Sequence, residues 1–262
     1  MPKPPRFFID PSQVAGSSIT IAGDDLRHIR TVLRKEAGEL LTLLDGQGVE
    51  YTVRITDIRK DGISTDVIER KERSRQGPSV TLGQGIAKAD KMDWIVQKAT
   101  ELGVSSIIPL VTERTIVKVK DEEKRIGRWQ RIAREAAMQS DRPDIPMVHE
   151  IMSYRDFLAR TPLNPPLARG EDKGGGSDAL TGTGRTLLLL PWEEGTEPIK
   201  QVLRAHPAAQ NIVVLIGPEG GFSRAEADAA RAKGFHLVSL GPNILRTETA
   251  AIAVLSMILY EF

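Results

Sequence analysis

The stretch that decides the fold is IVVLIGPEGGFSRAEADAARAKG, residues 212–234, which joins an apolar run to a glycine-rich turn and a helical pattern. Ile212–Ile216 is short and continuously apolar, as is typical of a parallel strand covered on both faces. Ser223 and Glu226 stand at capping-box spacing where the helix would begin, and Gly234 can end it. Strand, turn and helix in this order predict an α/β fold with a parallel sheet.

Two glycine-proline turns follow predicted strands in this part of the chain. The first is GPEGG at 217–221, and the second begins with GP at 241–242, after a predicted strand at 236–240. Glycine lets the backbone approach a ligand closely, and ligands of parallel α/β sheets bind outside the carboxyl ends of the strands. The two turns would therefore wall one pocket. The alternative is that the glycines serve only tight β–α turns, since the pattern fits neither the Rossmann fingerprint nor the P-loop.

The surrounding residues continue the alternation of strands and helices. Three further strands are predicted at 80–87, 106–111 and 187–190, and the last of these is continuously apolar, as expected for a parallel strand covered on both faces. Helical spacing predicts one helix from Asp90 to about Gly103 and another over 122–140. Residues 162–184 are rich in proline and glycine and nearly free of core residues, so we expect a mobile surface insertion there.

The first seventy or so residues are different and mostly β in pattern. Alternating runs predict strands at 39–44, 49–58 and 63–69. The loop DGQG at 45–48 contains an Asp-Gly pair, a strong hairpin signal because both turn residues must tolerate positive φ. We expect a small β-barrel or curled sheet, with a short helix near 24–35. The charged segment 69–78 ends in Gly-Pro and is typical of a linker.

The composition limits the classes of protein to consider. The 262 residues are 40% hydrophobic and 27% charged, which is ordinary globular usage, and the net charge is only +1. Any nucleic-acid binding must therefore depend on local positive charge. Because the chain has no cysteine and no clustered histidines, we expect no metal. We find no signal-peptide pattern and no apolar run long enough to span a membrane, so we expect a cytoplasmic protein.

Several long strings closely resemble those of one known family. IGPEGGFS at 216–223 and LGPNILRTETAA at 240–251 are similar to the signature of the bacterial 16S ribosomal RNA uracil-N3 methyltransferases, which belong to the SPOUT superfamily of knotted methyltransferases. The resemblance continues in four further strings, at 6–8, 28–34, 97–114 and 133–146. It therefore covers most of the chain and omits mainly 162–184.

The resemblance implies a domain organisation and partners. Residues 1–72 would form a PUA-like, RNA-binding β-barrel, and residues 73–262 a SPOUT methyltransferase domain with a C-terminal deep trefoil knot. The enzyme would be a homodimer with the last helix in the interface, acting on 16S ribosomal RNA of the small ribosomal subunit. The methyl donor would be S-adenosylmethionine. The residues expected to bind it are Leu190, Ile216, Gly217, Pro218, Glu219, Gly220, Gly221, Leu240, Gly241, Ile244 and Leu245.

Methyl transfer to N3 of uracil requires that a proton leave the ring, so the site must supply a base or stabilise the developing anion. Arg246, Glu219 and Glu248 are the catalytic candidates. We favour Arg246 together with the nearby helix N-terminus as the stabiliser of negative charge, because arginine does not act as a base at neutral pH. Glu219 and Glu248 are candidate bases, with the alternative that each only favours a helix N-terminus electrostatically.

Five arginines, and His28 from a string that carries the resemblance, are candidates for contact with RNA. These candidates are Arg6, His28, Arg30, Arg34, Arg128 and Arg131. Arg128 and Arg131 belong to an arginine row on the helix predicted at 122–140, which would be a phosphate track or only a solvated face.

Two other functions remain open. One is a knotted methyltransferase that acts on transfer RNA or on a ribose 2′-hydroxyl. The other is a non-catalytic RNA-binding or assembly factor, against which the intact GPEGG and ILRTETA strings argue.

Overall fold

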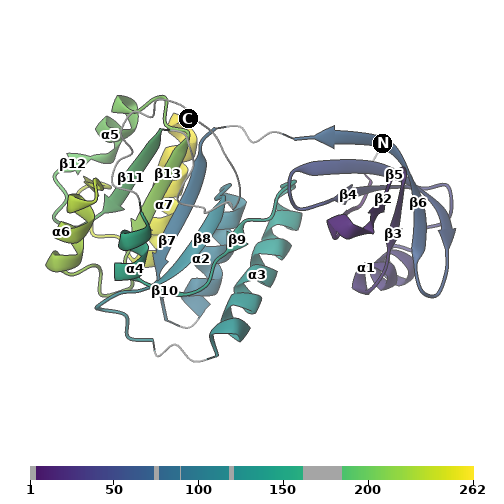
Figure 1. Cartoon of the computed structure of the whole chain (residues 1–262), viewed down its shortest axis with the longest axis horizontal. Coiled ribbons are helices and arrows are strands. Elements are labelled where there is room, and N and C mark those ends of the chain that lie inside the picture. Colours follow the sequence, from purple (N-terminus) through teal and green to yellow (C-terminus); the bar gives the residue numbers. More distant parts are fainter. Residues whose placement is uncertain (1–3, 74–76, 89, 118–120, 162–184) are drawn as a thin grey trace. The chain divides into compact units, whose positions relative to one another are not determined.

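The structure, a computed structural model, describes residues 4–73, 77–88, 90–117, 121–161 and 185–262. The chain divides into two compact units, whose elements are labelled in Figure 1. The first unit contains residues 1–76 and 137–145, and the second contains 77–136 and 146–262. The insertion expected at 162–184 lies outside the described residues.

The first unit is built on one six-stranded sheet with the order β1-β4-β5-β6-β3-β2. All neighbours are antiparallel except β1 and β4, which are parallel. Along β5 the exposed and buried side chains alternate, so that Tyr51, Val53 and Ile55 enter the core as predicted. The elements are β1 (Arg6–Phe8), η1 (Pro11–Gln13), β2 (Val14–Ala15), β3 (Ser18–Ile21), α1 (Asp24–Arg27), η2 (His28–Val32), β4 (Leu40–Leu44), β5 (Val49–Ile58) and β6 (Ile63–Glu72).

The helix expected near 24–35 is shorter and less regular than predicted. α1 covers Asp24–Arg27 and passes into η2, a single π-helical turn over His28–Val32. Arg34 then adopts a φ of 50°, in the left-handed region that ends a helix. The wider π-turn leaves Val32 66% exposed. The spacing of apolar residues that predicts an α-helix corresponds to 3.6 residues per turn, so it does not reveal a π-turn.

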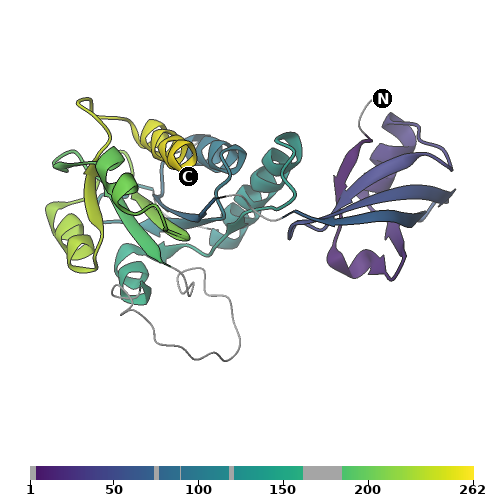
Figure 2. The ribbon, with the colours of Figure 1, turned by 90° about the horizontal axis from the view of Figure 1, so that it is seen from above.

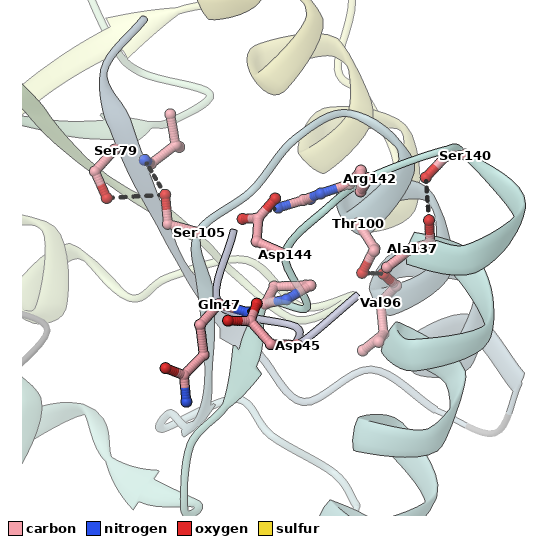
Figure 3. A network of polar contacts seen from close by, with 12 residues as sticks. Asp45, Gln47, Ser79, Val96, Thr100, Ser105, Ala137, Ser140, Arg142 and Asp144 are labelled. Carbon is pink, nitrogen blue, oxygen red and sulfur yellow. Dashed lines mark hydrogen bonds and ion pairs between the residues drawn. The ribbon is translucent and has the colours of Figure 1, made fainter. Parts of the chain in front are cut away.

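The loop between β4 and β5 confirms the predicted hairpin but not its turn. The Asp45 carboxylate accepts hydrogen bonds from the backbone N–H groups of Gln47 at 2.8 Å and Val49 at 2.9 Å (Figure 3). Positive φ angles occur at Gly46 (73°) and Gly48 (111°) and not at Asp45. The expectation of two successive positive angles in an Asp-Gly pair was therefore wrong. The aspartate side chain shapes the turn instead, as in an Asx-turn.

Residues 137–145, far along the chain, belong to the first unit. The backbone N–H of Ile145 donates to the carbonyl of Gly46 at 3.0 Å. Arg142 is buried and forms an ion pair with Asp144 at 2.8 Å (Figure 3). Sequence patterns did not predict this grouping, because periodicity reports local structure and not the unit that a segment joins.

The second unit is the predicted α/β structure with a parallel sheet. Its strand order is β10-β8-β7-β13-β11-β14-β12, with β9 beside β8, and every pair is parallel. The strands are β7 (Ser79–Gly85), β8 (Ser106–Val111), β9 (Met147–Val148), β10 (Met152–Ser153), β11 (Thr186–Pro191), β12 (Glu197–Pro198), β13 (Asn211–Ile216) and β14 (His236–Ser239). The helices are α2 (Asp90–Glu101), α3 (Glu122–Gln139), α4 (Tyr154–Arg160), α5 (Ile199–Ala205), α6 (Arg224–Ala232) and α7 (Thr247–Glu261).

Helices cover both faces of this sheet. Leu188 and Leu190 of β11 share a buried cluster with side chains of α4 and α6. Leu189 is also buried and points to the opposite face, on which α2 and α7 lie (Figure 2). This double cover explains why β11 and β13 are continuously apolar. Among the described helices, none has the length and apolar character that crossing a bilayer requires.

Candidate active site

A cavity of about 400 Å³ opens at the carboxyl ends of three neighbouring parallel strands, β11, β13 and β14. Its walls include both glycine-proline turns, at 217–221 and 241–246. The segment after β11 and the first turns of α2 and α7 complete the lining. This is the edge at which parallel α/β sheets bind their ligands.

Most of the sequence-predicted site residues line this cavity. They are Ile216, Gly217, Pro218, Glu219, Gly220, Gly221, Leu240, Gly241, Ile244, Leu245 and Arg246. Two predicted residues do not line it. Leu190 is fully buried, because its side chain packs into the cluster formed with α4 and α6. Glu248 lies in the first turn of α7, behind the lining residues.

Close packing behind the cavity explains two of the glycines. A Cβ atom added to Gly217 would lie 2.9 Å from the backbone carbonyl carbon of Gly221. A Cβ atom added to Gly85, at the end of β7, would lie 2.5 Å from Pro218. Either side chain would force the first turn to move. Gly217 therefore must be glycine because of close packing and not because of its backbone angles, and the positive φ of this turn, 68°, belongs to Gly221.

The predicted capping box fixes the helix that follows the first turn. The Ser223 N–H donates to the Glu226 carboxylate at 2.9 Å, and the Ser223 hydroxyl accepts from the Glu226 N–H at 3.3 Å. The same carboxylate accepts a hydrogen bond from the N–H of Glu113 at 2.8 Å. Arg114 donates to the carbonyl of Gly220 at 2.8 Å. The loop after β8 thus holds both the turn and the start of α6.

A buried polar chain links the two turns beneath the cavity. The Thr247 hydroxyl donates to the carbonyl of Gly217 at 2.6 Å. The same hydroxyl accepts from the side-chain amide of Gln84 at 3.0 Å, and that amide also donates to the carbonyl of Gly85 at 2.9 Å. Gln84 is fully buried. The end of β7 therefore fixes the first turn relative to the start of α7.

Glu219 is held as a carboxylate at the rim of the cavity. Burial raises its pKa, but hydrogen bonds from the backbone N–H groups of Lys88 and of Glu219 itself, with the charge of Lys91, outweigh burial and lower the pKa overall. The Lys88 N–H lies 3.0 Å from Oε1. A carboxylate with a lowered pKa is a weak base, which argues against proton abstraction by Glu219.

Lys91 lies between the two glutamates that sequence analysis proposed as bases. Its Nζ is 3.4 Å from Glu219 Oε1 and 3.5 Å from Glu248 Oε2. Glu248 Oε2 is buried, and no described residue forms a hydrogen bond with it. Lys91 itself lines the cavity.

Arg246 is the second cation of the cavity lining and is placed differently from Lys91. It is exposed and is the N-cap residue of α7. Within the part of the chain that the structure describes, no carboxylate forms an ion pair with it, so its charge is available to a ligand. The N-terminus of the fifteen-residue helix α7 adds partial positive charge at the same place.

Several residues of the site were not predicted from the sequence. Lys91, Trp192 and Thr247 line the cavity, and Gln84 lies behind it. Thr247 follows Arg246 directly within a string that carried the family resemblance, so proximity could have indicated it. Nothing in the sequence distinguishes Lys91 from Lys98, the other lysine of α2.

The RNA-binding candidates of the first unit fall into two groups. His28, Arg30 and Arg34 are exposed, in η2 or just after it. Arg6 is only 13% exposed and forms ion pairs with Asp141 at 3.2 Å and Glu50 at 3.6 Å. Its charge is therefore offset inside the unit, whereas the charges of Arg30 and Arg34 face solvent.

The candidates on α3, in the second unit, are both exposed. Arg128 forms an ion pair with Asp93, whose other carboxylate oxygen accepts a hydrogen bond from the indole N–H of Trp129 at 3.1 Å. Asp93 therefore fixes the position of Arg128 on the helix surface. Among the described residues, no group of three or more histidine, aspartate or glutamate side chains could hold a metal ion.

Comparison with known proteins agrees with this architecture. The model of a family described as "RNA methyltransferase domain" matches residues 75–259, and that of an "RNA methyltransferase PUA domain" matches residues 21–68. The ribosomal RNA small subunit methyltransferase E of Bacillus subtilis is 30% identical, over 98% of this chain and 96% of its own. The Aquifex aeolicus protein of the same name is 31% identical, over 93% and 95%.

Solved structures of methyltransferases are also similar to this chain. The ribosomal RNA small subunit methyltransferase E of Neisseria gonorrhoeae, bound to S-adenosylmethionine, is 31% identical with a TM-score of 0.80, over 98% of each chain. A putative methyltransferase of Legionella pneumophila, also in complex with S-adenosylmethionine, is 29% identical with a TM-score of 0.77, over 98% of each chain. With its parallel sheet, its cavity between two glycine-proline turns and these matches over nearly its whole length, the chain belongs to the ribosomal RNA small subunit methyltransferase E family, as its sequence motifs predicted.

Proposed function

We propose that this chain transfers a methyl group from S-adenosylmethionine to N3 of a uracil in 16S ribosomal RNA of the small ribosomal subunit. The observation that carries the proposal is the cavity at the carboxyl ends of β11, β13 and β14, walled by both glycine-proline turns. Two relatives that cover 98% of the chain have been solved with S-adenosylmethionine bound. The name of the family supports ribosomal RNA of the small subunit as the substrate.

The residues of the cavity suit this donor. Ile216, Leu240 and Leu245 give apolar surface to its adenine and methionyl parts, and the turn at 217–221 offers backbone groups without large side chains. Their cavity of about 400 Å³ is within the range of cofactor sites. When bound, S-adenosylmethionine supplies an electrophilic methyl group on its sulfonium.

Arg246 is the residue that we assign to the chemistry. N3 of uracil gains negative charge as its proton leaves, and a fixed cation beside it lowers the barrier. Arg246 lines the cavity with its charge not offset by a carboxylate of the described residues, and it stands at the N-terminus of α7. Glu219 and Glu248 are weaker candidates, because both lie against Lys91.

The finer features of the fold belong to the same proposal. The first unit, which includes residues 137–145, is a PUA-like barrel that binds RNA, and the second unit is a SPOUT domain with a deep trefoil knot. The enzyme works in the cytoplasm as a homodimer through α7. Leu259 and Tyr260, exposed near the end of that helix, support the dimer because large apolar side chains at a helix end favour burial against a partner.

RNA contact is assigned to exposed arginines and to His28. His28, Arg30 and Arg34 of the first unit and Arg131 of α3 are exposed, and Arg128 is exposed while paired with Asp93. Arg6 contributes through its ion pairs to the first unit rather than by direct contact.

The test is methylation in vitro, with Arg246→Ala and Arg246→Lys beside the native enzyme. Purified small subunits should accept a methyl group at N3 of one uracil, whereas transfer RNA should accept none. Arg246→Ala should lower the single-turnover rate at saturating donor by roughly 100-fold or more, as loss of a charge-stabilising group does. Arg246→Lys should keep part of the rate, because the charge remains. Methylation of transfer RNA or of a ribose hydroxyl would favour the alternative function.

A further inference from the structure

We propose that Lys91 is a positioning residue for the donor site: it bridges Glu219 on one wall of the cavity and Glu248 behind the other, and so keeps the two walls together. The inference rests on the proposed function, because it concerns the geometry of the site for S-adenosylmethionine. It gives the two glutamates a structural task instead of proton transfer.

The bridge joins three elements that are distant in sequence. Lys91 stands in the first turn of α2, Glu219 in the turn after β13, and Glu248 in the first turn of α7. Both carboxylates lie within 3.5 Å of the same ammonium nitrogen. A single side chain therefore contacts the two segments that carry the glycine-proline turns.

The surroundings of Glu248 show why the ammonium matters. Its Oε2 is buried, and no hydrogen-bond donor of the described residues reaches it, so Lys91 at 3.5 Å is the compensating charge. Glu219 has a second partner in the N–H of Lys88. If Lys91 lost its charge, two carboxylates would face each other in a partly buried place. Burying a charge without its partner costs more than the pair contributes when intact.

The bridge also gives the two cations of the cavity, Lys91 and Arg246, different roles. Lys91 is matched by two carboxylates, and Arg246 by none of the described residues. The charge of Lys91 therefore acts within the protein, and that of Arg246 is free to act on a ligand. Replacing Lys91 should change donor binding, whereas replacing Arg246 should mainly change the rate at saturating donor.

The experiment measures donor affinity by calorimetry for the full chain. Lys91→Met keeps the length of the side chain and removes its charge, and we expect it to weaken binding of S-adenosylmethionine about ten-fold, the effect of leaving a partly buried charge unpaired. In a double-mutant cycle with Glu248→Gln the two losses should not add, because each substitution breaks the same bridge, so the double variant should bind donor about as weakly as Lys91→Met. Lys91→Arg should bind nearly as well as the native protein.

Lys98 provides a matched control on the same helix. It pairs with Glu101 at 2.8 Å and does not line the cavity, so Lys98→Met should leave donor affinity unchanged. Lys91 has a side chain 37% exposed, so its variants should fold, which thermal unfolding checks. If Lys91→Met fails to fold, Glu248→Gln alone still reports on the bridge. Its donor affinity should fall by about three-fold or more, because the contact between Lys91 and the start of α7 is lost.

Three results would overturn the inference while leaving the proposed function intact. They are native donor affinity in Lys91→Met, losses that simply add in the double variant, and a Glu248→Gln variant that binds donor normally but loses methyl transfer. The last would identify Glu248 as the base. Failure of the native protein to bind S-adenosylmethionine would instead reject the proposed function itself.

Discussion

At the scale of single residues, the hydroxyl of Thr247 connects the first turn to the start of α7, and removing the hydroxyl alone tests this role. Thr247→Val keeps the shape of the side chain but removes the bonds to the Gly217 carbonyl and the Gln84 amide. Because those groups are then left unpaired, we expect the free energy of unfolding to fall by about 1–3 kcal/mol. Donor affinity should fall as well, since the first turn loses its tie to α7. Thr247→Ser keeps the hydroxyl and is the control. Denaturant unfolding and calorimetry measure both effects, and equal behaviour of the two variants would contradict the argument.

Single residues of the site differ in whether the sequence could predict them. The residues of the two turns are consecutive, so a motif names them together, and nearly all of them line the cavity. The resemblance named Leu190 for its backbone groups, and the packing of its side chain into the core does not test that expectation. Gln84 and Lys91 belong to β7 and α2, and only the folded sheet brings them to the turns. A polar side chain in a strand or helix gives no sequence signal of a partner more than a hundred residues away.

At the scale of elements, the start of α6 controls the first turn. Ser223→Ala removes the hydroxyl that accepts from the N–H of Glu226. Loss of such a cap costs about 1 kcal/mol of stability. Because the turn at 217–221 leads directly into α6, its amide hydrogens should exchange faster with solvent. Ser223→Thr retains a capping hydroxyl and should exchange like the native protein. Hydrogen exchange followed by mass spectrometry measures this, and unchanged protection of 217–222 in Ser223→Ala would show that the turn is held by other contacts.

Helices and strands were predicted correctly where the apolar residues follow a regular helical spacing or form a continuous run. They were predicted poorly where an irregular turn or a contact with a distant segment determines the structure. The continuous apolar runs of β11 and β13 and the helical spacing of α2 indicated their structure correctly. The helix expected near 24–35 became α1 and a π-turn, because the 3.6-residue pattern cannot report a wider turn. The segment 137–145 begins in the last turn of α3, an ordinary amphipathic helix, yet it joins the first unit through backbone pairing. Pairing between distant segments has no local pattern.

At the scale of the whole molecule, the two units should have separable tasks, RNA binding in the first and donor binding in the second. Arg30 and Arg34 are exposed on the first unit, and each phosphate contact contributes to the salt dependence of RNA binding. Replacing both by alanine should weaken binding of small-subunit ribosomal RNA and lower the slope of log affinity against log salt by roughly 1.5. Affinity for S-adenosylmethionine should not change, because the cavity residues all belong to the second unit.

The control for this prediction is an arginine of the same unit whose charge is already matched. Arg59 is exposed and forms an ion pair with Asp57 at 2.6 Å, so Arg59→Ala should leave both the affinity for RNA and its salt slope nearly unchanged. Fluorescence anisotropy at several salt concentrations gives the slopes, and calorimetry gives the donor affinity. If Arg30→Ala/Arg34→Ala kept the native slope, the phosphate contacts would have to come from another surface. The exposed Arg131 on α3 would then be the next residue to replace, because its positive charge also faces solvent.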